Sequence, residues 1–150
     1  MTYTDSVEIE VSLDRVSEIF SDPSNRIEWM DGIEAYEAKS GRPGREGFVS
    51  EMVFNNSGRE MVMTATVTEN NLPASFTERI EASHVTIIVE STFMSIAPDR
   101  TQYTSKQSYQ FKGLINKVMG FVLQRIFKNQ TRAHLEGFKR FAEKDDGIKP

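Results

Sequence analysis

The sequence predicts an α+β domain in which a curved, seven-stranded antiparallel sheet wraps around one long C-terminal helix, with two short helices between the first and second strands. The clearest strand runs from Thr101 to Phe111, where aromatic side chains recur at alternate positions. Gly113 breaks this alternation, and from Leu114 to about Lys144 apolar residues recur every three or four positions without a proline. About thirty residues at a rise of ~1.5 Å form a helix of about 45 Å, long enough to cross a small domain.

The N-terminal segments follow in order. Alternation from Val7 to Leu13 predicts a half-buried first strand. Asp14 is placed to cap a short helix that runs to Phe20, and Asp22 with the proline after it begins a second short helix that runs to about Met30. A second strand is predicted from Ile33 to Lys39.

A β-hairpin is predicted around Asn55 to Gly58, a segment rich in turn residues that allows a two- or four-residue loop. The predicted register pairs Phe54 with Arg59 and Met52 with Met61, which places the apolar side chains on one face. The strands after the first two are predicted at Phe48–Phe54, Glu60–Val67, Phe76–Ile80, Val85–Ile96 and Thr101–Phe111.

The sixth strand, Val85 to Ile96, contains a conflict. Its beginning places Val89 on the inner face, whereas an even turn after its end would place Thr92 there. Either an odd turn, which keeps Phe93 facing Tyr103, or a β-bulge between Val89 and Thr92 removes the conflict. We favour the odd turn.

Length and composition limit the class of protein. A chain of 150 residues is expected to form one domain, 1–150, with a loose tail over 145–150. The net charge of −4 argues against nucleic acid as a partner, because phosphate binding needs a basic surface. The absence of cysteine fits a reducing compartment. Because no signal peptide or long apolar run is visible, we expect a cytoplasmic protein without integral membrane association. A monomer or weak homodimer is expected.

Neither a metal nor a cofactor is expected. His84 and His134 are fifty residues apart and have no acidic partner at ligand spacing. The segment from Ser40 to Gly47 is glycine-rich and basic, but it lacks the lysine and hydroxyl residue that end a phosphate-binding loop.

Two segments carry a family resemblance. VEIEVSLDRVSEIFSDPSNRIEWMDGI, from Val7 to Ile33, resembles the opening of polyketide-cyclase-like and START-related proteins, the SRPBCC superfamily that includes the birch pollen allergen, and Trp29 matches a tryptophan just before their second strand. The segment from Phe111 to Glu143 looks like the terminal helix of the bacterial polyketide-cyclase-like branch. The resemblance implies the helix-grip fold. It does not fix the function, because the superfamily includes lipid carriers, hormone receptors, cyclases and co-chaperones.

The predicted inner surface is rich in methionine and aromatic residues. Methionine is flexible and polarizable, and it recurs on surfaces that accept varied apolar ligands. The same side chains could instead fill a solid core, so the binding hypothesis requires a cavity above about 100 Å³. The predicted apolar lining is Met52, Phe54, Met61, Met63, Val67, Phe76, Ile80, Tyr103 and Tyr109 on the strands, and Met119, Val122, Leu123 and Ile126 on the helix.

Glu78 is the sharpest polar candidate on this surface, because alternation directs it inward between Phe76 and Ile80. A lone carboxylate there should have a raised pKa and could act as acid, base or polar anchor, unless it reaches water or pairs with a basic residue. Ser105 and Gln107 share the inner face and could hydrogen-bond a ligand or each other.

The leading functional hypothesis is the binding of a hydrophobic small molecule or lipid in a cavity between the sheet and the C-terminal helix. One alternative is a cyclase- or dehydratase-type enzyme acting on a polyketide-like or aromatic substrate, with Glu78 as general acid or base and Tyr103, Tyr109 and Gln107 as orienting groups. Binding without catalysis is favoured. A co-chaperone or protein-interaction module would need a large exposed apolar patch, which the strand patterns do not predict.

The long helix also carries a loose basic stripe, which could dock on an anionic membrane surface or form a solvated face. Glu136 and Glu143 are spaced for helical ion pairs with this stripe, which favours the solvated face. Its members are Lys117, Arg125, Lys128, Arg132 and Lys139.

Overall fold

A computed structural model of the chain describes residues 1–56, 58–114 and 116–148. One antiparallel sheet contains all seven strands in the order β1-β7-β6-β5-β4-β3-β2. The strands are β1 (Thr2–Ile9), β2 (Ile33–Ser40), β3 (Val49–Asn56), β4 (Arg59–Asn71), β5 (Ser75–Glu81), β6 (Val85–Ala97) and β7 (Arg100–Phe111). The helices are α1 (Leu13–Ser21), the 3-10 turn η1 (Pro23–Asn25), α2 (Arg26–Trp29) and α3 (Lys117–Ile148).

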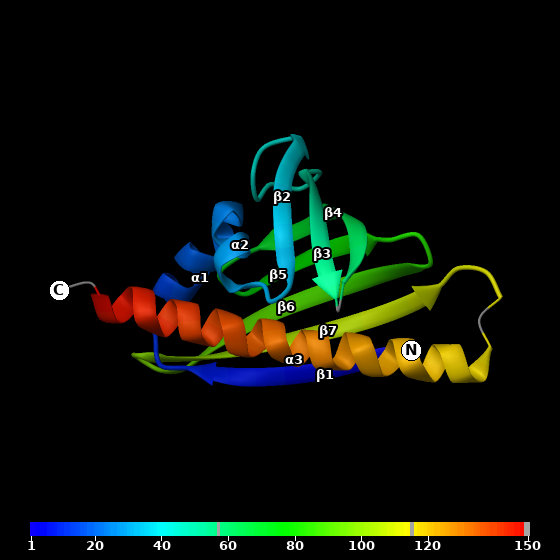
Figure 1. Cartoon of the computed structure of the whole chain (residues 1–150). Helices are drawn as coiled ribbons and strands as arrows, with labels where there is room; N and C mark the ends of the chain where they lie inside the picture. The colour runs from blue at the N-terminus through cyan, green and yellow to red at the C-terminus, as the bar shows by residue number, and fades with distance from the viewer. Residues whose placement is uncertain (57, 115, 149–150) are drawn as a thin grey trace.

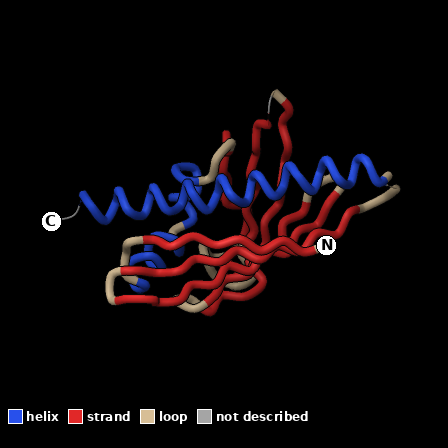
Figure 2. Tube along the Cα trace, turned by 90° about the horizontal axis from the view of Figure 1, so that it is seen from below, coloured by secondary structure: helices blue, strands red, loops and turns tan. Residues whose placement is uncertain are grey.

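The arrangement is the predicted α+β helix-grip fold. Figure 1 shows α3 running the length of the molecule alongside β1, with α1 and α2 near its C-terminal half. The view from below in Figure 2 shows the same helix lying across the strands of the sheet. The helix and the sheet therefore enclose the space in which the buried side chains meet.

The first strand and helix lie slightly differently from the prediction. The strand β1 begins earlier and ends at Ile9, and α1 is capped by Ser12, whose side chain accepts a hydrogen bond from the backbone N–H of Arg15, rather than by Asp14. The cap at Asp22 is confirmed, since its carboxylate accepts from the N–H of Ser24. These caps place α2, and with it Arg26 and Trp29, over the sheet.

The β3–β4 hairpin keeps the predicted face but not the predicted register. The structure pairs Phe54 with Met61 and Met52 with Met63, two residues away from the prediction. The reason is the loop length, because Asn56 already pairs with Arg59 and only two residues separate them. A shift of two leaves every side chain on its original face, whereas a shift of one would have reversed them all.

The expected pairing of Phe93 with Tyr103 is present, but it does not come from an odd turn, because Ala97 pairs with Arg100 across two residues. Phe93 pairs with Tyr103, and the register changes between Ser95 and Ala97, at the turn itself. The alternation along β6 is unbroken from Val85 to Phe93, so the bulge considered between Val89 and Thr92 is not there. A register shift in β4 between Val67 and Glu69 instead bends the sheet beside Glu78.

The helix α3 begins three residues later than predicted and ends later. Gly113 has a φ of +82°, which a residue with a Cβ rarely adopts, so it turns the chain out of β7. The side chain of Asn116 accepts from the N–H of Met119 and caps the helix. The helix continues to Ile148, so 145–148, assigned to a tail by the sequence, belong to it, and 149–150 lie outside the described residues.

Two clusters of buried side chains form the core. One surrounds Phe20, which contacts Trp29 and Phe138 through their rings at the α1 end of the molecule. The other contains Met52 and Phe127 toward the β3–β4 hairpin. The candidate site lies where the two clusters meet.

Candidate functional site

A cavity of about 70 Å³ lies under the middle of α3. This volume is below the value of about 100 Å³ that the binding hypothesis required, so a ligand fits here only if the cavity enlarges. Its apolar walls come from Phe20, Trp29, Met30, Met52, Phe54, Met63, Ile80, Ile87, Val89, Tyr103, Phe127 and Leu135. Its polar lining consists of Arg26, Glu78, Ser91, Ser105, Gln107, Gln130, Thr131 and His134.

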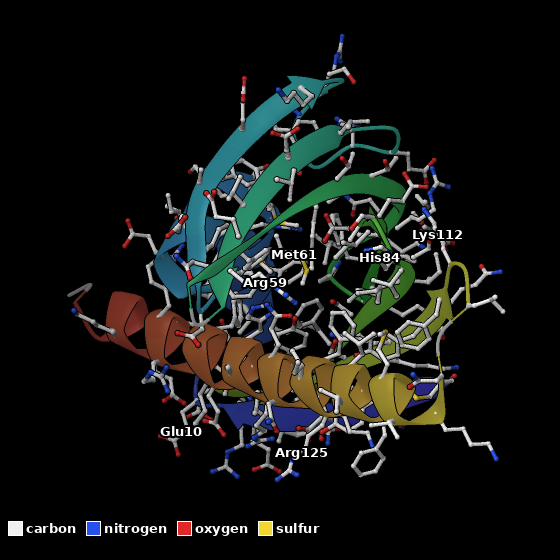
Figure 3. All side chains as sticks on the ribbon, turned by 45° about the vertical axis from the view of Figure 1, so that its right-hand side comes forward. Glu10, Arg59, Met61, His84, Lys112 and Arg125 are labelled. Carbon is white, nitrogen blue, oxygen red and sulfur yellow. The ribbon has the colours of Figure 1, made fainter. Side chains whose placement is uncertain are left out.

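Half of the predicted lining residues reach this cavity. They are Met52, Phe54, Met63, Glu78, Ile80, Tyr103, Ser105 and Gln107. Val67 and Phe76 are buried in the cluster around Phe20, whereas Tyr109, Met61 and Leu123 belong to or pack against the other cluster. Figure 3 shows Met61 on β4 between the sheet and α3.

The helix face is where the predicted lining departs most from the structure. Met119 and Val122 lie on the surface with about half of each residue exposed (50% and 49%), and Ile126 lines a different depression. The helix presents Phe127, Thr131 and other residues of the next turns to the cavity instead. The periodicity of α3 is apolar on more than one side near its start, so the pattern could not identify the buried side.

Glu78 points inward as predicted, but it is not alone. Its carboxylate accepts a hydrogen bond of 2.6 Å from the guanidinium of Arg26, and both residues are buried, at 7% and 6% exposure. The ion pair therefore satisfies a carboxylate that was a candidate for free acid or base. Arg26 lies on α2, 52 residues away in the chain, so spacing along the sequence could not reveal it.

Gln107 forms a hydrogen-bonded chain along β7. The hydroxyl of Tyr109 donates to Gln107 Oε1 at 2.6 Å, and Gln107 Nε2 donates to the hydroxyl of Ser105 at 3.5 Å. These groups bond one another, which is one of the two predicted alternatives. Burial raises the pKa of Tyr103 and that of Tyr109 to about 12, so both phenols are protonated donors at neutral pH.

His134, on α3, is a site residue that the sequence analysis missed. Its Nε2 atom is buried and has no hydrogen-bond partner among the described residues, although part of the residue reaches the surface. Burial lowers the pKa of His134 to about 4, and the ring hydrogen-bonds the main chain at Asp31. The imidazole is therefore neutral at pH 7. The signal available in the sequence was the position of His134 on the helix, two turns after Phe127 and therefore on the same face.

Trp29 supplies a second buried polar atom without a partner in the described part of the chain, its indole Nε1. The Trp29 and His134 rings lie 6.5 Å apart between centroids and nearly perpendicular, at 87°. Both side chains line the cavity. A neutral imidazole nitrogen and an indole N–H provide one acceptor and one donor, which is what a hydroxyl group requires.

Trp29 and Met30 also line a wider surface cleft of about 580 Å³. The remaining residues of this cleft are mainly polar or charged, among them Glu28 and Arg140. Trp29, at the end of α2, and Met30, which follows it, therefore border both the buried cavity and the surface cleft.

Within the described residues, no three His, Asp or Glu side chains are grouped so that they could hold a metal ion. Among the same residues, no helix has both the length and the apolar character needed to cross a membrane.

One family model matches most of the chain, and solved structures share its fold. A family model described as "Polyketide cyclase / dehydrase and lipid transport" matches residues 1–143. No curated protein matches the chain in sequence.

Three solved structures are similar over nearly their whole lengths. The Zhui aromatase/cyclase from Streptomyces sp. R1128 has a TM-score of 0.83 at 16% identity, with 95% of this chain and 93% of that chain covered. A START superfamily protein from Mycobacterium smegmatis has a TM-score of 0.80 at 14% identity, with 95% and 97% covered. The major latex-like protein 151 from Panax ginseng has 0.74 at 11%, also with 95% and 97% covered. At these identities the likeness shows a shared fold.

Proposed function

The chain belongs to the polyketide cyclase/dehydrase and lipid transport family, and we propose that it binds a hydrophobic small molecule carrying a hydroxyl group in the cavity under α3. The observation that carries this proposal is the pair of buried polar atoms without partners among the described residues, His134 Nε2 and Trp29 Nε1, in a mostly apolar cavity. Buried polar atoms are almost always hydrogen-bonded in folded proteins. A ligand hydroxyl that donates to His134 and accepts from Trp29 satisfies both.

The cavity must enlarge to hold such a ligand. A dry cavity of about 150 Å³ accommodates benzene, roughly twice the volume of this one. Three of its wall residues are methionines, Met30, Met52 and Met63, whose side chains change rotamer at low cost. Met30 also faces the surface cleft, so its movement provides both volume and access.

The test uses two probes that differ only in a hydroxyl group, 2-naphthol and naphthalene, titrated against the full chain. We expect 2-naphthol to bind about ten-fold more tightly, since one hydrogen bond to an otherwise unsatisfied buried group contributes about 1–2 kcal/mol. His134→Leu should remove that preference and leave naphthalene binding nearly unchanged. Equal affinities for the two probes in the unchanged protein contradict the role of the hydroxyl.

A matched pair of variants on β7 tests the location. Ser105 is buried and lines the cavity, whereas Ser108 faces the other side of the sheet. Ser105→Leu should fill the cavity and abolish the binding of both probes, and Ser108→Leu should not. If the Ser105→Leu protein is folded and binds both probes as tightly as the unchanged chain, the ligand site is elsewhere.

The enzymatic alternative has less support. Glu78 was its only acid, and that carboxylate is paired with Arg26. His134 lines the cavity, but a base with a pKa of about 4 removes protons poorly at neutral pH, because a general base works best when its pKa is near the operating pH. Its imidazole suits the acceptance of a ligand hydrogen bond better.

The cytoplasm is the compartment we propose, since the chain has no cysteine.

A further inference from the structure

The beginning of α3 exposes a cluster of apolar side chains, which we call the apolar patch. It contains Leu114, Val118, Met119, Phe121 and Val122, with exposures of 105%, 74%, 50%, 66% and 49%. These are half of the large apolar residues that are exposed in the described part of the chain, and they fall within nine consecutive positions. Exposed apolar side chains gathered in this way mark an interaction surface.

The patch points away from the cavity. Val118, Phe121, Val122 and Arg125 are spaced as positions i, i+3, i+4 and i+7, so they share one face of the helix. Phe127, which is buried against the sheet, lies on the opposite face. In Figure 3 Arg125 lies at the lower edge of the molecule, outside α3. The first turns of α3 thus present an apolar face to the surroundings.

The charged residues near the patch in the sequence are all positive. The 36 residues from Arg100 to Leu135 contain seven Lys or Arg and no Asp or Glu, so the rest of the chain carries all 22 acidic residues against 11 basic ones. Lys112, Lys117 and Arg125 are exposed and form no ion pair with any described residue. A chain with a net charge of −4 therefore concentrates free positive charge beside its exposed apolar side chains.

The other members of the basic stripe are already engaged. Lys128 lies over the ring of Tyr3, Arg132 pairs with Asp5 and Glu136, and Lys139 pairs with Glu143. The solvated-face interpretation holds for this part of the helix. Lys117, which lies within the span of the apolar patch, and Arg125, which follows it, are exposed and lack such ion pairs with the described residues.

We propose that the first turns of α3 dock on an anionic lipid surface, with the apolar patch inserted among the acyl chains and Lys112, Lys117 and Arg125 at the headgroups. Apolar side chains on a helical face with basic residues at its border are the pattern of helices that lie in a membrane interface. A second copy of the chain fits less well, because a two-fold contact through this patch would bring like charges together. Docking here is independent of what the cavity binds.

The experiment is flotation of the full chain with vesicles of phosphatidylglycerol and phosphatidylcholine in equal amounts, and with vesicles of phosphatidylcholine alone. We expect binding to the anionic vesicles that weakens as salt is added, since salt screens exposed charges. Arg125→Gln should weaken binding about five-fold, because one basic residue near an anionic surface is worth about that factor. Val118→Asn should weaken it at least as much, because it removes an apolar side chain from the acyl region.

Two matched variants serve as controls. Val62 is similarly exposed on β4 (53%), and Arg59 is an exposed arginine at the hairpin, so Val62→Asn and Arg59→Gln should bind vesicles like the unchanged chain. The proposal is overturned if the unchanged chain does not bind anionic vesicles at low salt, or binds neutral ones equally well. It is also overturned if Val118→Asn leaves vesicle binding intact, or if its effect is to dissociate a dimer or a complex with another protein.

Discussion

At the scale of single residues, three ionisable side chains from different helices and strands determine the charge state of the protein's interior. Glu78 on β5 and Arg26 on α2 neutralise each other at 2.6 Å in a buried position. His134 on α3 remains uncharged because the ring is desolvated. Since charged groups are costly to bury without a partner, the charge states of these residues are tied to the folded state.

Glu78→Gln should destabilise the protein by about 3 kcal/mol, because it leaves the Arg26 guanidinium buried without a counter-charge. Urea denaturation measures this loss. Glu81→Gln, on the same strand, is the matched control. Its pair with Arg79 is 3.6 Å long and about 44% exposed, so it should cost less than about 1 kcal/mol. Equal losses in the two variants would show that the buried pair contributes no more than a surface pair.

The stability should fall in acid because of His134. Its pKa is about 4 when folded and about 6.5 when unfolded, so the unfolded state binds more protons between these values. The free energy of unfolding should therefore decrease by about 2–3 kcal/mol as the pH falls from 6.5 to 4. His134→Gln should flatten this dependence in denaturation experiments, whereas His84→Gln, at the exposed histidine, should retain it. Identical pH profiles for all three proteins would contradict the assignment.

At the scale of elements, α3 consists of two different halves. The C-terminal half packs closely, and at Gly137 it approaches α2 so nearly that a Cβ would overlap the carbonyl oxygen of Trp29. The N-terminal half has exposed apolar residues and is held by the Asn116 cap. Packing therefore stabilises the C-terminal end of the helix, whereas capping and helical propensity stabilise its N-terminal end.

Alanine substitutions at two glycines of α3 should have opposite effects. Gly137→Ala should cost about 3 kcal/mol, because the added methyl forces α3 away from α2. Gly120→Ala should stabilise the protein by up to about 1 kcal/mol, since alanine favours the helix over glycine. Urea denaturation of both variants tests this contrast. A destabilised Gly120→Ala protein would mean that the start of α3 is closely packed at this position.

At the scale of the whole molecule, the sheet holds the chain together and α3 closes it. All seven strands lie in one continuous sheet, and every pair of neighbours is antiparallel. The cavity is small because α3 lies close to the sheet at Phe127 and Leu135. Any ligand larger than this cavity must move the helix or the methionine walls, so local stability along α3 affects access.

Amide hydrogen exchange should reveal this gradient. The segment from Phe121 to Gln124 has no fully buried residue, whereas Thr131, Leu135 and Phe138 are almost completely buried. We expect the amides of the first segment to exchange at least about a hundred-fold faster than those near Phe138, because they open without global unfolding. Uniform protection along the whole helix would exclude local opening at its start as the route of access.

The sequence by itself determined the order of the elements and the face of each strand. Alternation with a period of two is local, so it placed Glu78, Tyr103, Ser105 and the methionines inward even where the predicted pairing of β3 with β4 was wrong by two residues. Turn and cap residues act within a few positions, and they located the short helices to within one or two residues.

Only the tertiary structure decided which groups meet. The partner of Glu78 is 52 residues away, and the side of α3 that faces the sheet depends on where the helix crosses it, so Met119 lies outside and His134 inside. The cavity volume is the small difference between the space under α3 and the side chains that fill it. Such long-range contacts and volumes arise from the packing of all elements together, and no local pattern encodes them.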